Sequence, residues 1–200
     1  MADFARTPTL RALETVFLDR DGVLNEKMPE GEYVRSWEDF HLLPGVPMAI
    51  RRLNQAGLRA IVVSNQRGIS LGLYTASDVQ AIHSSFQELL RAQGAHVDGI
   101  YFCPHDKQQC NCRKPMTGLF DQAVADAPEI AAETSAIIGD SFSDIAFGQR
   151  LGMLTVFIDG PPHSQPPNAE AARHMASLHF HSLAEAVESL LGQFPPAEQH

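Results

Sequence analysis

The architecture of this 200-residue chain follows from residues 15–22, which read Thr-Val-Phe-Leu-Asp-Arg-Asp-Gly. Residues 16–18 form a short apolar run of the kind found in a strand that is buried on both faces. Asp19 and Asp21 follow, and Gly22 lets the chain turn sharply. In an open α/β sheet, ligands bind at the carboxyl ends of the strands. The stretch therefore predicts a ligand site at the end of a buried strand.

Asp19 and Asp21 suit phosphate chemistry. Two carboxylates at this spacing repel each other unless a cation lies between them, and Mg²⁺ binds to one or two carboxylates together with phosphate oxygens and water. One carboxylate can attack phosphorus while the other moves a proton. The alternative for an isolated Asp-x-Asp-Gly is a turn with two solvated acids, so the rest of the chain has to distinguish the two interpretations.

The composition is typical of a soluble globular protein, with 44% hydrophobic and 20% charged residues. We expect one domain over residues 1–200, with a core at about 14–192. No apolar stretch approaches the roughly 20 residues of a membrane span, and the N-terminus lacks the layout of a signal peptide. A cytoplasmic location without membrane contacts is therefore expected, and a monomer is the expected oligomeric state. The net charge of −9 argues against nucleic-acid binding.

Four further apolar runs have the length of buried strands: residues 58–63, 99–102, 135–138 and 153–158. Helical spacing of apolar residues and capping signals predict helices that begin near Val46, Thr75, Thr117, Ser141 and Ser182. The Pro-rich segment 159–172 is expected to be a loop. The alternation of strand and helix predicts a three-layer α/β domain with a Rossmann-like parallel sheet and right-handed crossovers.

Polar residues follow several of these strands. Ser64 comes directly after the run 58–63, and Asp140 comes just after 135–138. Because the carboxyl ends of parallel strands share one edge, both residues should lie close to the two aspartates of the first strand. With Lys114 added, the set has three carboxylates, a hydroxyl and a lysine, which suits phosphoryl transfer. For Asp144, capping of the helix that follows is the alternative role.

Residues 103–112 contain a second cluster, Cys103, His105, Cys110 and Cys112. Three cysteines cannot all pair within one chain, and a Cys₃His set suits tetrahedral Zn²⁺. No position is left open for water, so the predicted zinc site is structural. The alternative is a set of free thiols with a chance histidine. Arg113 and Lys114 follow directly, so a rigid zinc loop would present two cations to an anionic substrate.

Four motifs together resemble those of the haloacid dehalogenase superfamily of phosphohydrolases. In chain order over about residues 15–160 they are Asp19-x-Asp21-Gly, the strand-end Ser64, Lys114, and Gly139-Asp140-x₃-Asp144. Residues 19–25, 63–69 and 103–115 look like the zinc-containing branch, which includes heptose-1,7-bisphosphate 7-phosphatases and histidinol-phosphate phosphatases. The resemblance implies a Mg²⁺-dependent phosphomonoesterase of carbohydrate or related metabolism. It also implies the absence of a large cap domain.

The resemblance implies a role for each acid. Asp19 would be the nucleophile that forms an aspartyl-phosphate, and Asp21 would protonate the leaving oxygen and then activate water. Asp19, the backbone carbonyl of Asp21 and Asp140 would bind Mg²⁺, with Asp144 in support. Ser64 and Lys114 would hold phosphoryl oxygens. The residues expected to contact the substrate are Asn25, Asn65, Gln66, Arg67 and Arg113.

Some positions depart from the family pattern. Ser64 stands where threonine is commoner, Arg67 where a small residue is usual, and Leu71 where an arginine is expected. Ser141 stands where some relatives have lysine. Two other classes of protein predict different patterns. A phospho-receiver domain would have adjacent acids after its first strand and a phosphorylated aspartate after the third, and a zinc-ribbon module would be basic with two separated ligand pairs. The sequence has neither pattern.

The expected substrate is a small polar phosphomonoester. Loops 26–36, 66–74 and 104–114 carry more cations than one transferring phosphate needs: Lys27, Arg35, Arg67, Lys107 and Arg113. Because arginine binds phosphate bidentately, this surplus favours heptose 1,7-bisphosphate. The stretch Tyr33-Val34 also resembles the heptose enzymes. Histidinol phosphate is the alternative: its amine would suit the acids Glu26, Glu30 and Glu32, and the short zinc loop resembles that group of enzymes.

Overall fold

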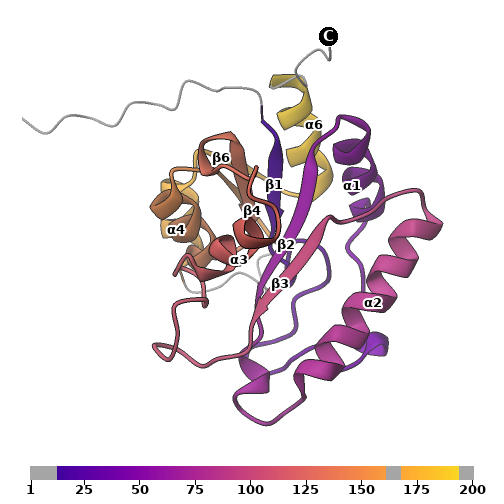
Figure 1. Ribbon diagram of the computed structural model, residues 1–200, viewed down its shortest axis with the longest axis vertical. Coiled ribbons are helices and arrows are strands. Elements are labelled where there is room, and N and C mark those ends of the chain that lie inside the picture. The colour runs from indigo at the N-terminus through magenta and orange to yellow at the C-terminus, as the bar shows by residue number, and fades with distance from the viewer. Residues whose placement is uncertain (1–12, 161–167, 194–200) are drawn as a thin grey trace, which may run out of the picture.

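The computed structural model describes residues 13–160 and 168–193. Within them, six parallel strands form one sheet in the order β3-β2-β1-β4-β5-β6, with β1 between β2 and β4 (Figure 1). The strands are β1 (Thr15–Leu18), β2 (Arg59–Asn65), β3 (Gly99–Cys103), β4 (Ser135–Gly139), β5 (Leu154–Ile158) and β6 (Leu178–Phe180). The expected parallel α/β architecture is confirmed.

Helices cover both faces of the sheet. The first face packs against α1 (Val46–Gln55), α2 (Ala76–Ala92) and α6 (Leu183–Gln193). The second face packs against α3 (Gly118–Asp126), α4 (Phe142–Leu151) and α5 (Ala169–Met175). Figure 1 shows these two layers on opposite sides of the strands. In the part of the chain that the structure describes, no helix is both long enough and apolar enough to cross a membrane.

The central strand β1 explains the position of the site. Its side chains alternate between the two faces, so Val16 and Leu18 join one core while Phe17 joins the other. The register pairs Leu18 with Val62 of β2 and with Ile138 of β4. The three strands therefore end side by side, and the polar residues that follow them emerge at one edge of the sheet.

Capping signals placed most helix starts correctly. Thr75 and Asp78 form the expected capping box of α2, and Ser141 and Asp144 form one at the start of α4. Thr117 occupies the N-cap position of α3, but its side chain makes no capping hydrogen bond, so the predicted cap is wrong in that respect.

The C-terminal part of the sheet differs from expectation. The segment 159–172 was expected to be a loop, but α5 begins at Ala169. Residues 161–167 of that segment lie outside the described residues. The short strand β6 was not predicted, because its three residues include His179 and make no apolar run. Pairing with β5 determines this strand more than its own sequence does.

Candidate active site

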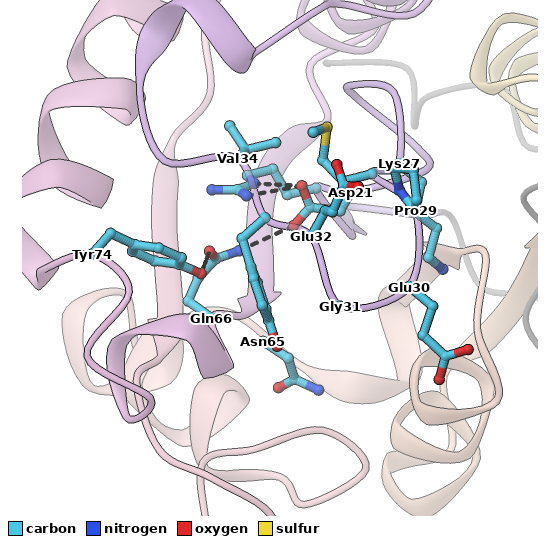
Figure 2. A pocket seen from close by; sticks show the side chains of 13 residues that line it. Asp21, Lys27, Pro29, Glu30, Gly31, Glu32, Val34, Asn65, Gln66 and Tyr74 are labelled. Carbon is cyan, nitrogen blue, oxygen red and sulfur yellow. Dashed lines mark hydrogen bonds and ion pairs between the residues drawn. The ribbon is translucent and has the colours of Figure 1, made fainter.

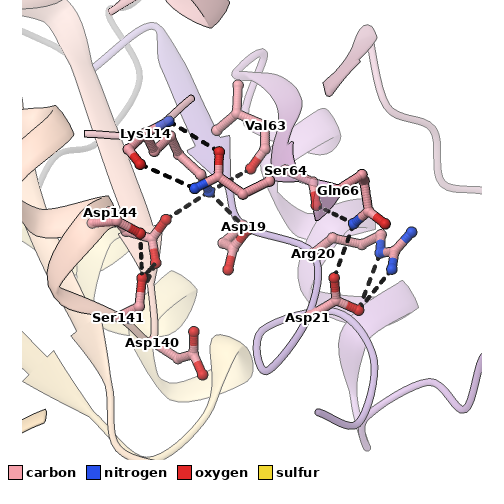
Figure 3. Close-up of polar contacts among 12 residues, drawn as sticks. Asp19, Arg20, Asp21, Val63, Ser64, Gln66, Lys114, Asp140, Ser141 and Asp144 are labelled. Carbon is pink, nitrogen blue, oxygen red and sulfur yellow. Dashed lines mark hydrogen bonds and ion pairs between the residues drawn. The ribbon is translucent and has the colours of Figure 1, made fainter. Parts of the chain in front are cut away.

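The ends of β1, β2 and β4 open into a cavity of about 230 Å³, which we call the strand-end cavity. Asp19, Ser64 and Asp140 line it, as the sequence predicted. Asp21 and Lys114 line it as well, although they come from the turn after β1 and from the segment after the Cys/His loop. The structure therefore brings together all five residues that were expected to carry phosphate chemistry (Figure 3).

Lys114 is the buried cation of this cavity. Its Nζ donates hydrogen bonds to Asp19 Oδ1 at 2.7 Å and to the Val63 carbonyl at 2.6 Å. The same Nζ lies 2.6 Å from Asp144 Oδ1. Burial alone would lower the pKa of Lys114, but the carboxylates of Asp144 and Asp19 outweigh burial and raise that pKa. Lys114 therefore stays protonated and offsets the negative charge of Asp19 and Asp144.

Two carboxyl groups of the cavity lack sufficient positive charge around them. Burial and the nearby Asp144 raise the pKa of Asp19 to about 7, although Lys114 opposes the shift. Burial likewise raises the pKa of Asp140 to about 6, against the effect of Lys27. Asp140 Oδ1 is buried and has no hydrogen-bond partner among the described residues. These shifts indicate a site in which a further cation would be stabilised.

The geometry of the three acids fits a hard divalent cation. Carboxylate oxygens of Asp19, Asp140 and Asp144 all lie within 4.8 Å of one another. Oxygen donors of this kind are the ligands of Mg²⁺, which also keeps room for phosphate oxygens and water. The turn after β1 is adapted to this site, because Gly22 has φ +98° and a Cβ there would lie 2.3 Å from Asp140 Oδ2.

Lys27 reaches the same acids from the loop after β1. Its Nζ lies 2.6 Å from Asp140 Oδ2. Burial would lower the pKa of Lys27, but the charge and hydrogen bond of Asp140, together with the charges of Asp19 and Asp144, outweigh burial and raise that pKa. Sequence analysis counted Lys27 among the loop cations available for a second phosphate. Its pairing with Asp140 reduces the number of those cations that have no acidic partner.

Asp21 faces away from Asp19 (Figure 3). Its Oδ1 accepts hydrogen bonds from Arg20 Nη2 at 2.8 Å and from Asn25 Nδ2 at 3.0 Å, and its Oδ2 accepts one from Gln66 Nε2 at 3.1 Å. Burial would raise the pKa of Asp21, but the Arg20 guanidinium and these hydrogen bonds outweigh burial and lower that pKa. In this arrangement Asp21 is a carboxylate held next to Arg20.

Asn65 and Gln66, both expected to contact the substrate, hold other site residues in place. Asn65 accepts a hydrogen bond from the Lys114 backbone amide at 2.9 Å and donates one to the Lys114 carbonyl at 3.1 Å. Gln66 Nε2 donates to Ser64 Oγ at 2.7 Å, and its Oε1 accepts from the Tyr74 hydroxyl at 2.9 Å. Tyr74 was missed by sequence analysis, because a single tyrosine in a loop carries no motif.

The other predicted substrate residues are distributed differently. Arg113 lines the strand-end cavity, as expected. Asn25 is fully buried and donates to Asp21 and to the Glu26 carbonyl. Arg67 pairs with Asp106, its Nε lying 2.5 Å from Asp106 Oδ1. Neither Asn25 nor Arg67 is among the residues that line the strand-end cavity, so their contact with substrate stays a prediction.

The Cys/His loop brings its four predicted ligands together. Cys103 Sγ lies 3.4 Å from Cys110 Sγ and 3.2 Å from Cys112 Sγ, and His105 Nδ1 lies 3.3 Å from Cys112 Sγ. A tetrahedron with metal–sulfur bonds of about 2.3 Å has edges of about 3.8 Å, close to these separations. Burial raises the pKa of Cys103 and Cys112, so without a cation these thiols hold their protons. The donor set fits Zn²⁺ in a closed site.

A second cavity of about 220 Å³ adjoins the first, and we call it the loop cavity (Figure 2). Asp21 and Lys27 line both cavities. The loop cavity is otherwise formed by Arg20 and the segment 28–34, which carries Glu30 and Glu32, together with the side chains of Asn65, Gln66 and Tyr74. Its acids distinguish it from the side of the strand-end cavity that Arg113 and Lys114 line.

Comparisons with known proteins agree with this geometry. The family described as HAD-hydrolase-like matches residues 111–186. The chain is 41% identical over 137 residues to D-glycero-alpha-D-manno-heptose-1,7-bisphosphate 7-phosphatase of Mycobacterium tuberculosis, covering 68% of this chain and 72% of that protein. It is 37% identical over 155 residues to D-glycero-D-manno-heptose-1,7-bisphosphate 7-phosphatase of Thermosynechococcus vestitus, covering 72% and 77%.

A solved structure leads to the same family. The crystal structure of D,D-heptose 1,7-bisphosphate phosphatase from B. bronchiseptica, complexed with magnesium and phosphate, superimposes with a TM-score of 0.76 and 28% identity. The match covers 90% of this chain and 99% of that chain. Together with the acids and the lysine of the strand-end cavity, these similarities identify the chain as a phosphatase of the haloacid dehalogenase-like hydrolase family.

Proposed function

We propose that this chain removes the 7-phosphate from D-glycero-D-manno-heptose 1,7-bisphosphate. The observation that carries the proposal is the strand-end cavity, where Lys114 neutralises Asp19 beside a group of acids that lacks one cation. The relatives named for this substrate, at 41% and 37% identity, support its identity. We further propose that the chain acts as one catalytic domain, as a monomer, and in the cytoplasm.

Two metals fit the residues present. Asp19 and Asp140, with Asp144 in support and the Asp21 carbonyl, would hold Mg²⁺, and Mg²⁺ bound there would supply positive charge to the phosphoryl oxygens. Cys103, His105, Cys110 and Cys112 would hold a structural Zn²⁺. The unpartnered Asp140 Oδ1 and the clustered thiols support these assignments.

In the proposed first step, Asp19 attacks phosphorus and the bond from phosphorus to the sugar O7 breaks. The leaving oxygen takes a proton from Asp21, which must leave Arg20 and carry a proton to serve as the acid. Lys114 and Ser64 hold the phosphoryl oxygens while charge develops on them. The products of this step are the sugar 1-phosphate and an aspartyl-phosphate at Asp19.

In the second step, water attacks the phosphorus of the aspartyl-phosphate. Asp21, now a carboxylate, accepts a proton from that water, and the bond from phosphorus to the Asp19 oxygen breaks. Inorganic phosphate leaves and Asp19 returns as a carboxylate. The hydrogen bonds that surround Asp21 in the structure stabilise the ionised form that this step requires.

Histidinol phosphate is the second candidate substrate, because one observation favours it. Three acids, Asp21, Glu30 and Glu32, line the loop cavity against two cations, Arg20 and Lys27, and this excess of acids would attract the cationic amine of histidinol phosphate. The heptose bisphosphate carries a second anion and would be repelled from these acids. The two substrates therefore predict different cavities for the part of the molecule that is not transferred.

Comparing kcat/KM for the two compounds tests the proposal. Both anomers of heptose 1,7-bisphosphate and histidinol phosphate are assayed for phosphate release with Mg²⁺ present. We expect at least a tenfold preference for one anomer of the heptose bisphosphate, about 1.4 kcal/mol of transition-state stabilisation. A tenfold preference for histidinol phosphate would overturn the proposed substrate, and absence of turnover with all three would exclude both candidates.

A further inference from the structure

A third cavity shares part of its lining with the strand-end cavity, and we call it the basic cavity. Its volume is about 730 Å³, larger than either of the other two. Asn65, Arg113, Lys114 and Ser143 line both the basic cavity and the strand-end cavity, so the two are continuous. A ligand bound at Asp19 can therefore extend into this space.

The basic cavity has charge of one sign only. Its charged lining residues are Lys107, Arg113, Lys114 and Arg150, and none of its lining residues is an aspartate or glutamate. This is unexpected in a chain with a net charge of −9. A cleft lined by one sign of charge concentrates the opposite ion, so the ligand of this cavity is an anion.

Arg150 is the cation that the sequence did not indicate. It lies in the last turn of α4 and is exposed, with its Nη1 3.9 Å from Met116 Sδ. Among residues 13–160 and 168–193, no carboxylate lies within ion-pair distance of Arg150 or Lys107. Arg67 and Lys27, by contrast, each pair with an aspartate.

Helix α4 contributes residues to both the strand-end cavity and the basic cavity. Ser143, in its first turn, lines both of them, whereas Arg150, in its last turn, lines only the basic cavity. Seven residues of helix separate the two positions, a rise of about 10 Å along the axis. An anion bound at Arg150 is therefore distinct from the phosphoryl group that reacts at Asp19.

We infer that Arg150 determines specificity by binding, together with Lys107 and Arg113, the second phosphate of a sugar bisphosphate. The inference rests on the proposed function and deepens it, since it says where the phosphate that is not removed binds. A guanidinium suits this role because it binds phosphate through two parallel hydrogen bonds. The loop cavity suits the same anion less well, because its three lining acids outnumber its two cations, Arg20 and Lys27.

The test measures preference for a second phosphate. Heptose 1,7-bisphosphate and heptose 7-phosphate compete with p-nitrophenyl phosphate, and each inhibition constant gives affinity even if the compound is not turned over. The ratio of the two constants is compared in the wild type, Arg150→Gln and Arg150→Lys. Arg91→Gln is the matched control, because Arg91 is an exposed arginine in the last turn of α2 and lines none of the three cavities.

We expect the wild type and Arg91→Gln to prefer the bisphosphate equally. Arg150→Gln should reduce that preference about tenfold, as expected for loss of a hydrogen-bonded charge pair, and Arg150→Lys should have an intermediate effect. An unchanged preference in a folded Arg150→Gln protein would overturn the role of Arg150. So would a wild type that binds both compounds equally. Either result can occur while heptose 1,7-bisphosphate is still hydrolysed, so this inference can fail without the proposed function failing.

Discussion

Lys114 and Asp19 form the pair on which the proposed chemistry depends. Lys114 is 3% exposed and its ammonium contacts two carboxylates and a carbonyl, so its charge acts in a region with little water to screen it. Asp19 gains a nearby cation without losing access to the strand-end cavity. A nucleophile that must remain ionised yet reach an anionic phosphoryl group requires this combination.

Asp19→Asn should abolish turnover and leave the fold intact. An amide cannot form the aspartyl-phosphate, and it is a weaker ligand for a cation, so we expect kcat to fall at least about a thousandfold. Phosphate release and thermal unfolding are measured on the same preparation, with Asp121→Asn, an exposed acid in the first turn of α3, as the control. Retention of a tenth of the wild-type rate would require a different nucleophile.

Asn65→Ala tests whether Lys114 is positioned from outside the cavity. The Asn65 amide bonds both the backbone N–H and the carbonyl of Lys114, so its loss should let Lys114 shift. Small displacements of catalytic groups are costly, and we expect kcat to fall about ten- to a hundredfold. If Asn65 instead only contacted substrate, KM would rise and kcat would be retained, and this outcome would contradict the positioning role.

At the level of single elements, the strand ends were predictable and the loop contacts were not. Asp19, Ser64 and Asp140 converge because parallel strands must end at one edge, so an apolar run followed by a polar residue was enough. The pairing of Arg67 with Asp106 depends on how two loops approach each other, which no local pattern encodes. The same reason hid the pairing of Lys27 with Asp140.

Helix α4 shows a second limit of sequence analysis. Its first turn was predictable, because Ser141 and Asp144 make a capping box with recognisable spacing. Arg150 at its other end resembled any solvated arginine, and only the structure places it at a cavity with Arg113 and Lys107. The fold could thus be predicted from periodicity, whereas the surroundings of exposed cations could not.

The Cys/His loop is expected to contain one structural zinc ion. Removal of the zinc by a chelator should lower the melting temperature by about 5 °C or more. The cysteine thiolates that bound the metal must then take up protons, and the loop loses the metal that linked its two ends. Elemental analysis and thermal unfolding measure both effects, and Cys110→Ser should reproduce the loss. Protein purified without chelators that contains no zinc would contradict the assignment.

Across the whole molecule, stability should depend on pH and Mg²⁺ together. The pKa of Asp19 is raised from 3.8 to about 7 and that of Asp140 from 3.8 to about 6. Between pH values of about 4 and about 7, Asp19 and Asp140 bind more protons in the folded metal-free protein than in the unfolded chain. Their contribution to the free energy of unfolding therefore falls as pH rises through this range. Mg²⁺ favours the ionised carboxylates and should counteract this loss.

The increase in melting temperature caused by Mg²⁺ should therefore be larger at pH 8 than at pH 5. Thermal unfolding with and without Mg²⁺ at the two pH values measures it. Asp140→Asn should remove most of the increase at both, whereas Asp126→Asn, at the C-terminal end of α3 and outside the strand-end cavity, should leave it unchanged. An equal increase at pH 5 and pH 8 would show that Mg²⁺ does not compete with protons on Asp19 and Asp140.

The arrangement of the three cavities predicts how the substrate is oriented when it binds. The phosphate at Asp19 is removed, and the phosphate in the basic cavity, near Arg150, is retained. ³¹P NMR of heptose 1,7-bisphosphate during turnover shows which phosphate is removed, because the phosphates at C1 and C7 give separate signals. We predict that the C7 signal is replaced by inorganic phosphate while the C1 signal persists in the product. Loss of the C1 phosphate first, or of both at equal rates, would contradict the proposed placement of the substrate.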